Sequence, residues 1–316
     1  NSSFGKIEVK GPDAESFLLK VCAGNMDREP GRVIYSAVLN QRGTFESDIT
    51  AHRIAKDHYR LFVGTTSIQR DLVWLANGAK GYNITLEDST SKYAVLAVMG
   101  PNSPQLINKC GASVLTELDY FRIGTSYIAG KHIRAARMSY VGEFGWEITC
   151  RSENASAIYS ALITEGGRPA GIWAQTSMRI EKGYCAIGHE LDSDISPVEA
   201  GLMFAVRKSG GFIGQEALEK RLSEVRVPSI VSLKLHEENA IPIGNETVYW
   251  KKKIIGQTSS CAFGYRVKAP IALARLSCQL IENSEVEIDI AGVMFKATVI
   301  HGPLYDPIGY RMKSNL

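Results

Sequence analysis

The chain has 316 residues and a formal net charge of +3, with 45% hydrophobic and 22% charged residues. A chain of this length usually forms more than one hydrophobic core, so two or three domains are expected. No cluster of Lys, Arg and aromatic residues predicts nucleic-acid binding, and no apolar run reaches the ~18 residues of a transmembrane helix. We therefore expect a globular protein with neither a nucleic-acid nor a membrane partner.

The first third of the chain alternates strands and helices. Hydrophobic periodicity predicts strands at 4–9, 33–39, 44–53, 58–63, 84–86 and 93–99, and helices at 14–21, 66–77 and 104–110. Asp13 stands where it would cap the first helix. A Gly-Pro pair followed by Asp or Asn precedes both the first and the third of these helices, so a strand–cap–helix unit occurs twice. This arrangement predicts an α+β fold.

The stretch 31–53 carries the most informative polar residue of this region. Two expected strands flank a turn at 40–43, in which Gly43 can adopt a positive φ. In the second strand, Asp48 falls on the face opposite Ile49, although Asp is depleted in strands. Its carboxylate therefore points either to solvent or into a polar pocket, and the strand pattern leaves both alternatives open.

The middle of the chain adds three more polar residues on apolar elements. Strands are expected at 121–128 and 132–138, and helices at 155–165, 174–183 and 215–222. A turn at 142–145 would place Tyr140 and Glu147 on opposite arms of a hairpin. Arg179 lies in the last turn of the helix that ends at Gly183. Spacing alone does not bring these residues together.

The pattern changes near residue 227, which we take as a domain boundary between 1–226 and 227–316. Short β-rich runs follow at 229–235, 247–250, 254–259, 271–276, 285–290 and 293–299. Strands that recur every 8–12 residues or so predict a small barrel or a sandwich. The basic run Lys251–Lys253 is expected at a solvated hairpin tip.

Common catalytic and cofactor-binding motifs are missing. The sequence has no dinucleotide-binding fingerprint, Walker loop, HExxH or GxSxG. Its six cysteines show neither a CxxC pair nor metal-ligand spacing with His, so we expect reduced core cysteines and no metal site. His189 could transfer protons or support its loop, and Cys185 could be a nucleophile or a packing residue. We favour the structural interpretation of both.

Eight motifs, in order along nearly the whole chain, resemble the aminomethyltransferase family. This family comprises the glycine cleavage T-protein and the folate-binding C-terminal region of dimethylglycine and sarcosine dehydrogenases. The motifs are SSFGKIEVKGPDAESFL (2–18), LNQRGTFESD (39–48), VMGPNSPQL (98–106), SYVGEFGWE (139–147), RIEKGYCAIGHEL (179–191), SPVEAGL (196–202), FIGQEAL (212–218) and PLYDPIGYRMKS (303–314).

Several details of these motifs are more similar to the dehydrogenase subgroup than to the T-protein. The segments GHEL, SPVEAGL and PLYDP resemble those of the dehydrogenase subgroup. Ser47 replaces the first Asp of a T-protein pair, of which Asp48 is the second member. Thr65 replaces an Asn of the T-protein, as in the dehydrogenase subgroup. These differences concern the amine substrate rather than the folate site.

The resemblance implies a three-subdomain α+β cloverleaf around a central hole that holds tetrahydrofolate, with a C-terminal β-barrel. It implies that Asp48 is the catalytic carboxylate, because a fixed carboxylate stabilises the cationic charge that develops when folate attacks an iminium or aminomethyl carbon. Tyr140 and Glu147 match positions that bind the pterin. Arg179 matches the position that faces the acidic end of folate. Tyr35 matches an active-site tyrosine near Asp48.

The implied activity is tetrahydrofolate-dependent one-carbon transfer from an N-methyl amine such as dimethylglycine or sarcosine, forming 5,10-methylenetetrahydrofolate. The alternatives are a non-catalytic regulatory or scaffold member of the family and a folate-dependent S-methyl demethylase. FAD is expected only on an upstream oxidase domain or a separate subunit, because the chain carries no FAD fingerprint and begins abruptly at Asn1. Reduced cysteines fit the bacterial cytoplasm or the mitochondrial matrix.

Overall fold

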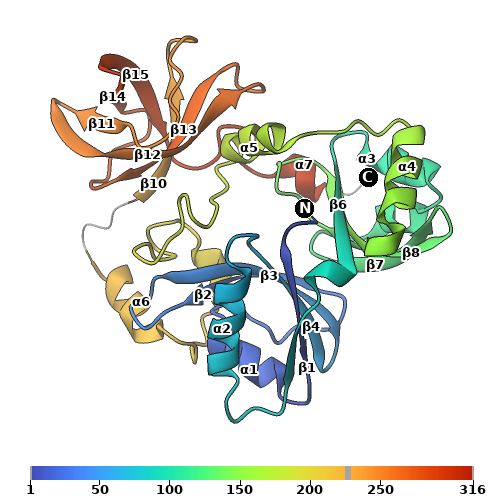
Figure 1. The fold of residues 1–316 in the computed structure, drawn as a ribbon. Coiled ribbons are helices and arrows are strands. Elements are labelled where there is room, and N and C mark those ends of the chain that lie inside the picture. Colours follow the sequence, from blue (N-terminus) through green and yellow to red (C-terminus); the bar gives the residue numbers. More distant parts are fainter. Residues whose placement is uncertain (1, 225–228, 315–316) are drawn as a thin grey trace.

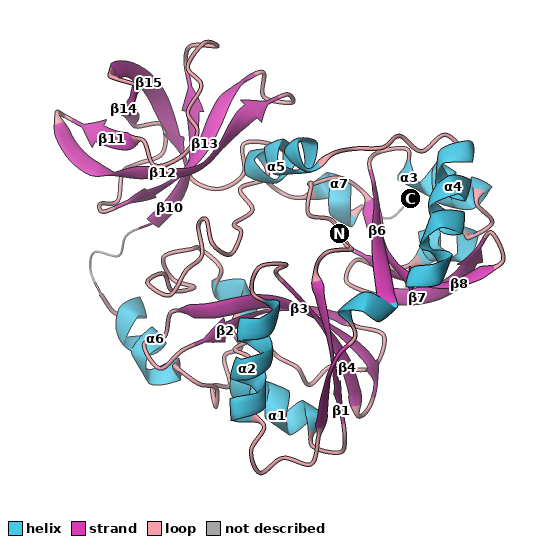
Figure 2. Cartoon of the chain, in the orientation of Figure 1, coloured by secondary structure: helices cyan, strands magenta, loops and turns pink. Residues whose placement is uncertain are grey.

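A computed structural model describes residues 2–224 and 229–314, which form three lobes around a common centre (Figure 1). Two lobes combine a sheet with helices, and the third is a barrel (Figure 2). The α+β cloverleaf expected from the sequence is confirmed, as is the C-terminal barrel. The boundary expected at 226/227 lies outside the described residues.

The first lobe is an antiparallel sheet of five strands in the order β2-β3-β4-β1-β5. The strands are β1 (Gly5–Lys10), β2 (Val33–Leu39), β3 (Phe45–Ala55), β4 (His58–Val63) and β5 (Thr85–Asp88). Helices α1 (Ala14–Val21) and α2 (Ile68–Gly78) cover one face, where Phe17 and Leu61 belong to a fully buried core. The chain returns to this lobe after residue 183 and adds α6 (Gln215–Leu222).

The second lobe is a four-stranded sheet in the order β6-β9-β8-β7. Its elements are β6 (Tyr93–Met99), β7 (Ile123–Ile128), β8 (Lys131–Arg137), β9 (Gly145–Arg151), α3 (Ser103–Lys109) and α4 (Ala155–Thr164). Its core centres on Trp146, a fully buried side chain whose indole N–H donates to the carbonyl of Leu115 at 3.1 Å. Short 3-10 turns occur at Thr90–Lys92, Ser113–Glu117 and Ser152–Asn154 in this lobe, and at Met203–Ala205 further along the chain.

Helix α5 (Ile172–Glu181) connects the second lobe to the barrel, and Ile180 packs on Ile271 and Leu273 there. The barrel strands are β10 (Ser229–Leu235), β11 (Thr247–Trp250), β12 (Lys253–Gly264), β13 (Ala269–Leu276), β14 (Glu285–Ile290) and β15 (Val293–Ile300). Because β10 pairs with both β13 and β15, the sheet closes and leaves no open edge. The barrel, and not the sandwich, is therefore the correct alternative.

The C-terminal segment 301–314, which contains α7 (Tyr310–Lys313), runs back from the barrel to the second lobe. Buried Arg137 lies 3.3 Å from the ring centre of Phe144 and donates to the carbonyl of Met312 at 2.7 Å. Lys182 forms an ion pair with Asp306 at 3.1 Å. These contacts hold the barrel against the second lobe.

Three local expectations are corrected by the structure. Asp13 stands at the start of α1 but does not cap it, because its carboxylate accepts the backbone N–H of Asn83 at 2.8 Å. Tyr140 is not on a hairpin arm, since β8 ends at Arg137 and the connection to β9 is a seven-residue loop, 138–144. Strand β12 continues to Gly264 through a change of register, beyond the predicted end at 259.

Other expectations are confirmed. Strands β2, β4 and β6 have the bounds expected from the sequence. The run Lys251–Lys253 is exposed at the β11–β12 hairpin, where Lys251 and Lys252 have positive φ. Within the described residues, no helix has both the length and the apolar character needed to span a bilayer.

Helix α6 packs closely against the β2–β3 turn at Gly43. Its φ of +72° is left-handed, and a Cβ added there would lie 2.6 Å from the backbone nitrogen of Leu218. Gly130 in the β7–β8 turn has a similar φ of +69°, but a Cβ there would meet nothing within 4 Å. A side chain would therefore strain the backbone at both positions, but only at Gly43 would it also clash with a neighbouring element.

We predict that Gly43→Ala lowers the free energy of unfolding by about 3 kcal/mol and Gly130→Ala by about 1 kcal/mol. Urea denaturation followed by tryptophan fluorescence measures both values. Equal losses in the two variants would show that the approach of α6 to the turn adds nothing to the backbone strain.

Candidate functional site

Tyr35 and Asp48 form a hydrogen-bonded pair on one face of the first sheet. Ala37 pairs with Asp48 and Tyr35 with Thr50, so the two side chains are diagonal neighbours on β2 and β3. The Tyr35 hydroxyl donates to Oδ2 of Asp48 at 3.0 Å. The ring of Tyr35 also stacks on Phe204, with ring centres 6.0 Å apart. Asp48 is half-buried, so of the two alternatives the polar pocket is correct.

The surroundings of Asp48 disfavour its charged form. Burial raises the pKa of this carboxyl to about 6, an effect that the Tyr35 hydrogen bond partly offsets and the nearby Asp71 carboxyl reinforces. Asp71 is itself buried and accepts hydrogen bonds from Ser67 at 2.7 Å and Ser47 at 3.1 Å. Asp48 therefore changes charge close to neutral pH, unlike an ordinary aspartate.

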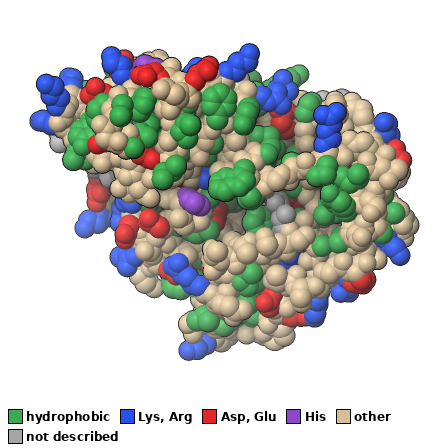
Figure 3. Space-filling model, turned by 45° about the horizontal axis from the view of Figure 1, so that its top comes forward, with side chains coloured by type: hydrophobic (Ala, Val, Ile, Leu, Met, Phe, Trp, Pro, Cys, Tyr) green, Lys and Arg blue, Asp and Glu red, His purple; other side chains and the backbone are tan. Residues whose placement is uncertain are grey.

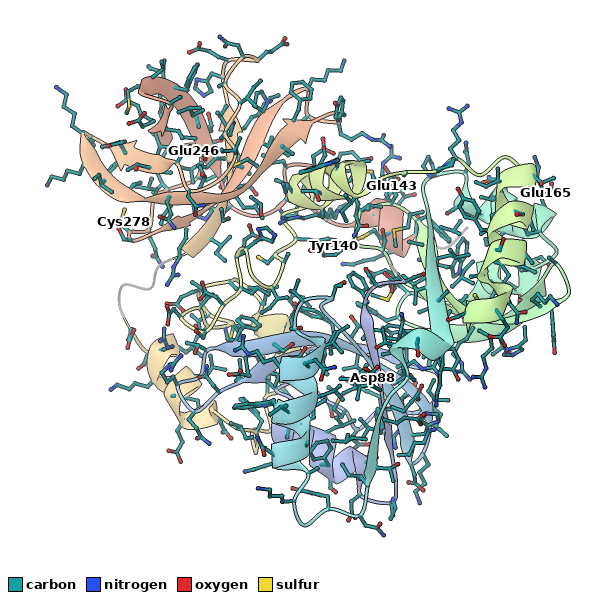
Figure 4. The ribbon with its side chains drawn as sticks, in the orientation of Figure 1. Asp88, Tyr140, Glu143, Glu165, Glu246 and Cys278 are labelled. Atoms are coloured by element: carbon teal, nitrogen blue, oxygen red, sulfur yellow. The ribbon has the colours of Figure 1, made fainter. Side chains whose placement is uncertain are left out.

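Tyr140 reaches the same region from the loop between β8 and β9. Figure 4 shows it near the centre of the molecule, where the three lobes converge. Its hydroxyl donates to the carbonyl of Cys185 at 2.8 Å, and its ring stacks on Tyr184 with 5.8 Å between ring centres. Burial raises the pKa of Tyr140, and the charges of Arg179 and Asp48 both act on this phenol. Tyr140, Arg179 and Asp48 are thus close enough to interact electrostatically.

Arg179 is buried in α5 and is bound on several sides. Its guanidinium donates to Glu190 at 2.9 Å, to the carbonyl of Tyr184 at 3.0 Å and to the Ser260 hydroxyl at 2.6 Å. Glu190 also accepts the Ser259 hydroxyl at 2.6 Å. This Arg179–Glu190 pair joins α5, the loop that returns to the first lobe, and barrel strand β12. Recognition of a folate carboxylate by Arg179 stays a prediction, since this guanidinium already holds a carboxylate.

Glu147 lies in the middle of strand β9, between Ala97 of β6 and Ala136 of β8. Its neighbours Trp146 and Ile148 fill the core of the second lobe, so the Glu147 side chain points to the opposite face of the sheet. The residue is buried, with an exposed fraction of 7%. Its predicted role in pterin binding stays a prediction.

A recess is visible near the centre of the molecule (Figure 3), where the three lobes of Figure 1 converge. Among the described residues, no group of three His, Cys, Asp or Glu side chains could hold a metal ion. The arrangement instead offers a carboxyl that titrates near neutrality, a phenol hydrogen-bonded to it, and an exposed aromatic ring, Phe204. Such a site can bind a flat heterocycle and exchange a proton with it or with a bound amine.

Comparison with known proteins identifies the family. The GCVT N-terminal domain family matches residues 1–210, and the glycine cleavage T-protein C-terminal barrel domain family matches residues 229–306. The chain belongs to the glycine cleavage T-protein family. This family is one of folate-dependent aminomethyltransferases.

Two relatives illustrate the range of the glycine cleavage T-protein family. Aminomethyltransferase of Geobacillus sp. (strain WCH70) is 32% identical over 313 residues, which cover 96% of this chain and 85% of the relative. Mitochondrial dimethylglycine dehydrogenase of Mus musculus is 30% identical over 314 residues, which also cover 96% of this chain. The chain spans only 36% of the length of that dehydrogenase.

A solved structure confirms the fold. The crystal structure of glycine cleavage system aminomethyltransferase T from Bartonella henselae matches with a TM-score of 0.89. The match covers 97% of this chain and 85% of the other, at 24% sequence identity.

The sequence leaves two roles open for each of Cys185 and His189, and the structure favours the structural role of both. Burial and the charge of Glu190 raise the pKa of Cys185, so its thiol stays protonated and is a poor nucleophile. Cys185 also packs against the core that joins the loop to β2 and α6. His189 is exposed beside Glu190, on the turn that places this carboxylate against Arg179.

Sequence reasoning missed several residues of the site. Glu190 is the partner of Arg179, although its place in the sequence predicts no such pairing. Phe204 and Tyr184 stack on the predicted tyrosines, and Ser260 comes from a strand 81 residues beyond Arg179. The motif RIEKGYCAIGHEL does contain Arg179, Tyr184 and Glu190, whereas no local signal identifies Ser260.

We predict that Glu190→Gln lowers the free energy of unfolding by about 3–5 kcal/mol, because it leaves Arg179 buried without a compensating charge. Urea denaturation measures the loss. The matched control is Glu285→Gln, which removes an exposed pair with Lys296 at 2.8 Å and should leave the urea midpoint unchanged. A Glu190→Gln variant as stable as that control would contradict the structural role of the pair.

The raised pKa of Asp48 predicts how stability depends on pH. Its contribution is complete below about pH 4, the unfolded-state pKa, and is lost as pH rises through the folded-state pKa of about 6. Asp48→Asn should therefore match the wild type near pH 4 and exceed its stability by about 2–3 kcal/mol above pH 7. Denaturation at a series of pH values tests this, and a difference that is independent of pH would contradict it.

Proposed function

We propose that the chain transfers a one-carbon unit from an N-methyl amine, such as dimethylglycine or sarcosine, to tetrahydrofolate. The observation that carries this proposal is the Tyr35–Asp48 pair, in which a carboxyl with a pKa of about 6 lies where the lobes converge. A carboxyl that is ionised at neutral pH and still basic enough to accept a proton suits this chemistry. Asp48 is the proposed catalytic residue.

The residues of the recess fit a pterin. Phe204 has 74% of its surface exposed and offers a flat face beside Tyr35, and the half-buried ring of Tyr140 offers a second one. A carboxylate such as that of Glu147 can accept two parallel N–H bonds from the amino-pyrimidinone edge of a pterin. We therefore assign pterin binding to Tyr140 and Glu147. Arg179 would meet the acidic end of folate only by sharing its guanidinium with Glu190.

Tetrahydrofolate, when bound, supplies the nucleophilic nitrogen that accepts the one-carbon unit. The ionised Asp48 stabilises the cationic amine that approaches this nitrogen, and it can accept the proton released as the new bond forms. Tyr35 orients the carboxylate by donating to Oδ2. Asp71 and the burial of the site keep the pKa of Asp48 high enough for this proton transfer.

The 30% sequence identity with dimethylglycine dehydrogenase over 96% of this chain supports the N-methyl amine as donor. An aminomethyl donor is the second candidate, because a relative that shares 85% of its length with this chain carries the name aminomethyltransferase. Since the dehydrogenase relatives are much longer than this chain, an FAD-dependent oxidase domain or subunit is the proposed source of the oxidised amine.

The test separates folate binding from catalysis. Calorimetric titration under anaerobic conditions should detect tetrahydrofolate binding, and Glu147→Gln should weaken it at least tenfold, a cost of about 1.4 kcal/mol. Glu153→Gln is the control, since Glu153 is exposed just beyond β9. Normal affinity in Glu147→Gln would contradict the assigned pterin site.

Turnover with formaldehyde-derived iminium, aminomethyl and sulfonium donors should identify the donor class. The apparent kcat/KM should rise with pH to a plateau, with a pKa of about 6, and Asp48→Asn should lower kcat at least a hundredfold with little change in folate affinity. Folate binding without turnover of any donor would favour the non-catalytic alternative. Turnover of the sulfonium alone would favour the S-methyl demethylase.

A further inference from the structure

A basic cavity lies between the sheets of the first and second lobes, near strands β4, β6 and β8 of Figure 1. Its volume is about 250 Å³. The lining residues are Arg60, Tyr93, His132, Arg134, Thr149, Cys150, Arg151 and Asn154. Liquid water occupies about 30 Å³ per molecule, so the basic cavity has room for a small ligand but not for a nucleotide or a folate.

Positive charge dominates the basic cavity. Arg60 is buried and balanced by Glu8, which accepts its Nε–H at 2.6 Å. Although burial opposes ionisation, hydrogen bonds from His58 and Arg60 and the charge of Arg60 lower the pKa of Glu8 to about 2. The side chains of Arg134 and Arg151 form no hydrogen bond or ion pair with any other residue that the structure describes. Neither charge has an ion-pair partner of its own there, although the Glu8 carboxylate that binds Arg60 also acts on Arg134.

Buried polar groups in and next to the basic cavity lack partners among the described residues. The Thr149 hydroxyl is buried and has no hydrogen-bond partner among the described residues. His52 does not line the basic cavity but pairs with Arg60 across β3 and β4, and both of its ring nitrogens also lack a partner among the described residues. Buried polar groups without partners are rare in folded proteins, and they commonly mark the place of a bound ligand or water.

The aromatic wall of the basic cavity orients its arginines. The guanidinium of Arg60 lies 3.7 Å from the ring centre of Tyr93, and that of Arg151 lies 5.0 Å from it. Stacking on an aromatic ring leaves the N–H edges of a guanidinium free to donate. Arg134 projects from β8 beside Thr149 of β9, its partner in the strand register.

We propose that the basic cavity binds a small, doubly charged oxyanion of the phosphate type. Arg134 and Arg151 would supply charge-assisted hydrogen bonds, and the Thr149 hydroxyl would supply a third donor. The basic cavity lies beyond the proposed catalytic carboxyl, because His52, the strand partner of Arg60, is four residues from Asp48 on the same face of β3, about 13 Å along the strand. On the second sheet the basic cavity adjoins the proposed pterin site, since Thr149 follows Glu147 by two residues on the same face of β9, about 7 Å along the strand.

The proposal is tested with inorganic phosphate as the probe. Titration of the full chain, followed by calorimetry at constant ionic strength, should show one saturable site. Arg151→Gln should weaken phosphate binding at least tenfold, and Arg134→Gln should do the same. The control is Arg168→Gln, because Arg168 is exposed in the loop between α4 and α5 and should leave the affinity unchanged within twofold.

Three further measurements decide whether the basic cavity is a separate phosphate site. Succinate is titrated in parallel, and binding of succinate without phosphate would overturn the phosphate assignment in favour of a dicarboxylate. No saturable binding of phosphate, or an equal loss in Arg168→Gln, would overturn the proposal. Arg151 is exposed, so its variant is expected to fold, and an unchanged tetrahydrofolate affinity in this variant would show that the two sites are independent.

Discussion

The buried Arg179–Glu190 pair is the constraint on which the arrangement of the lobes depends. Its members come from α5 and from the loop that returns to the first lobe, and barrel residues Ser259 and Ser260 complete it. A charge removed from water is costly unless it is paired and hydrogen-bonded on its remaining sides. The hydrogen bonds of both side chains form together only when helix α5, the returning loop and the barrel take this relative placement. The pair therefore determines the arrangement of the lobes more than it adds to stability.

The chemistry of the recess follows from this placement. The same loop that supplies Glu190 also supplies the Cys185 carbonyl, which holds the hydroxyl of Tyr140. The enclosure reduces the hydration of Asp48 and so raises its pKa to about 6. The proposed catalytic carboxyl thus obtains its raised pKa from the assembly of lobes, although Asp48 and Tyr35 lie on neighbouring strands of one sheet.

Much of this structure could be predicted from residues close in sequence. Alternation placed β2, β4 and β6 correctly, because strands with one buried face carry a strong local signal. Two of the three wrong expectations, at Asp13 and Tyr140, concern residues whose side-chain partners are distant: Asn83 is 70 residues away and Cys185 is 45 residues away. The hydrogen bond from Arg179 to the Ser260 hydroxyl is equally hard to predict, since a single serine in a β-strand has no distinguishing local pattern.

The contact between Arg137 and the C-terminal segment bears on how the protein is made. The carbonyl of Met312 that receives the Arg137 guanidinium lies 175 residues further along the chain. During synthesis, the second lobe therefore emerges with a buried arginine whose partner has not yet been translated. Contacts of such long sequence separation form late and slow the search for the native state. The second lobe therefore reaches its final packing only after α7 has left the ribosome.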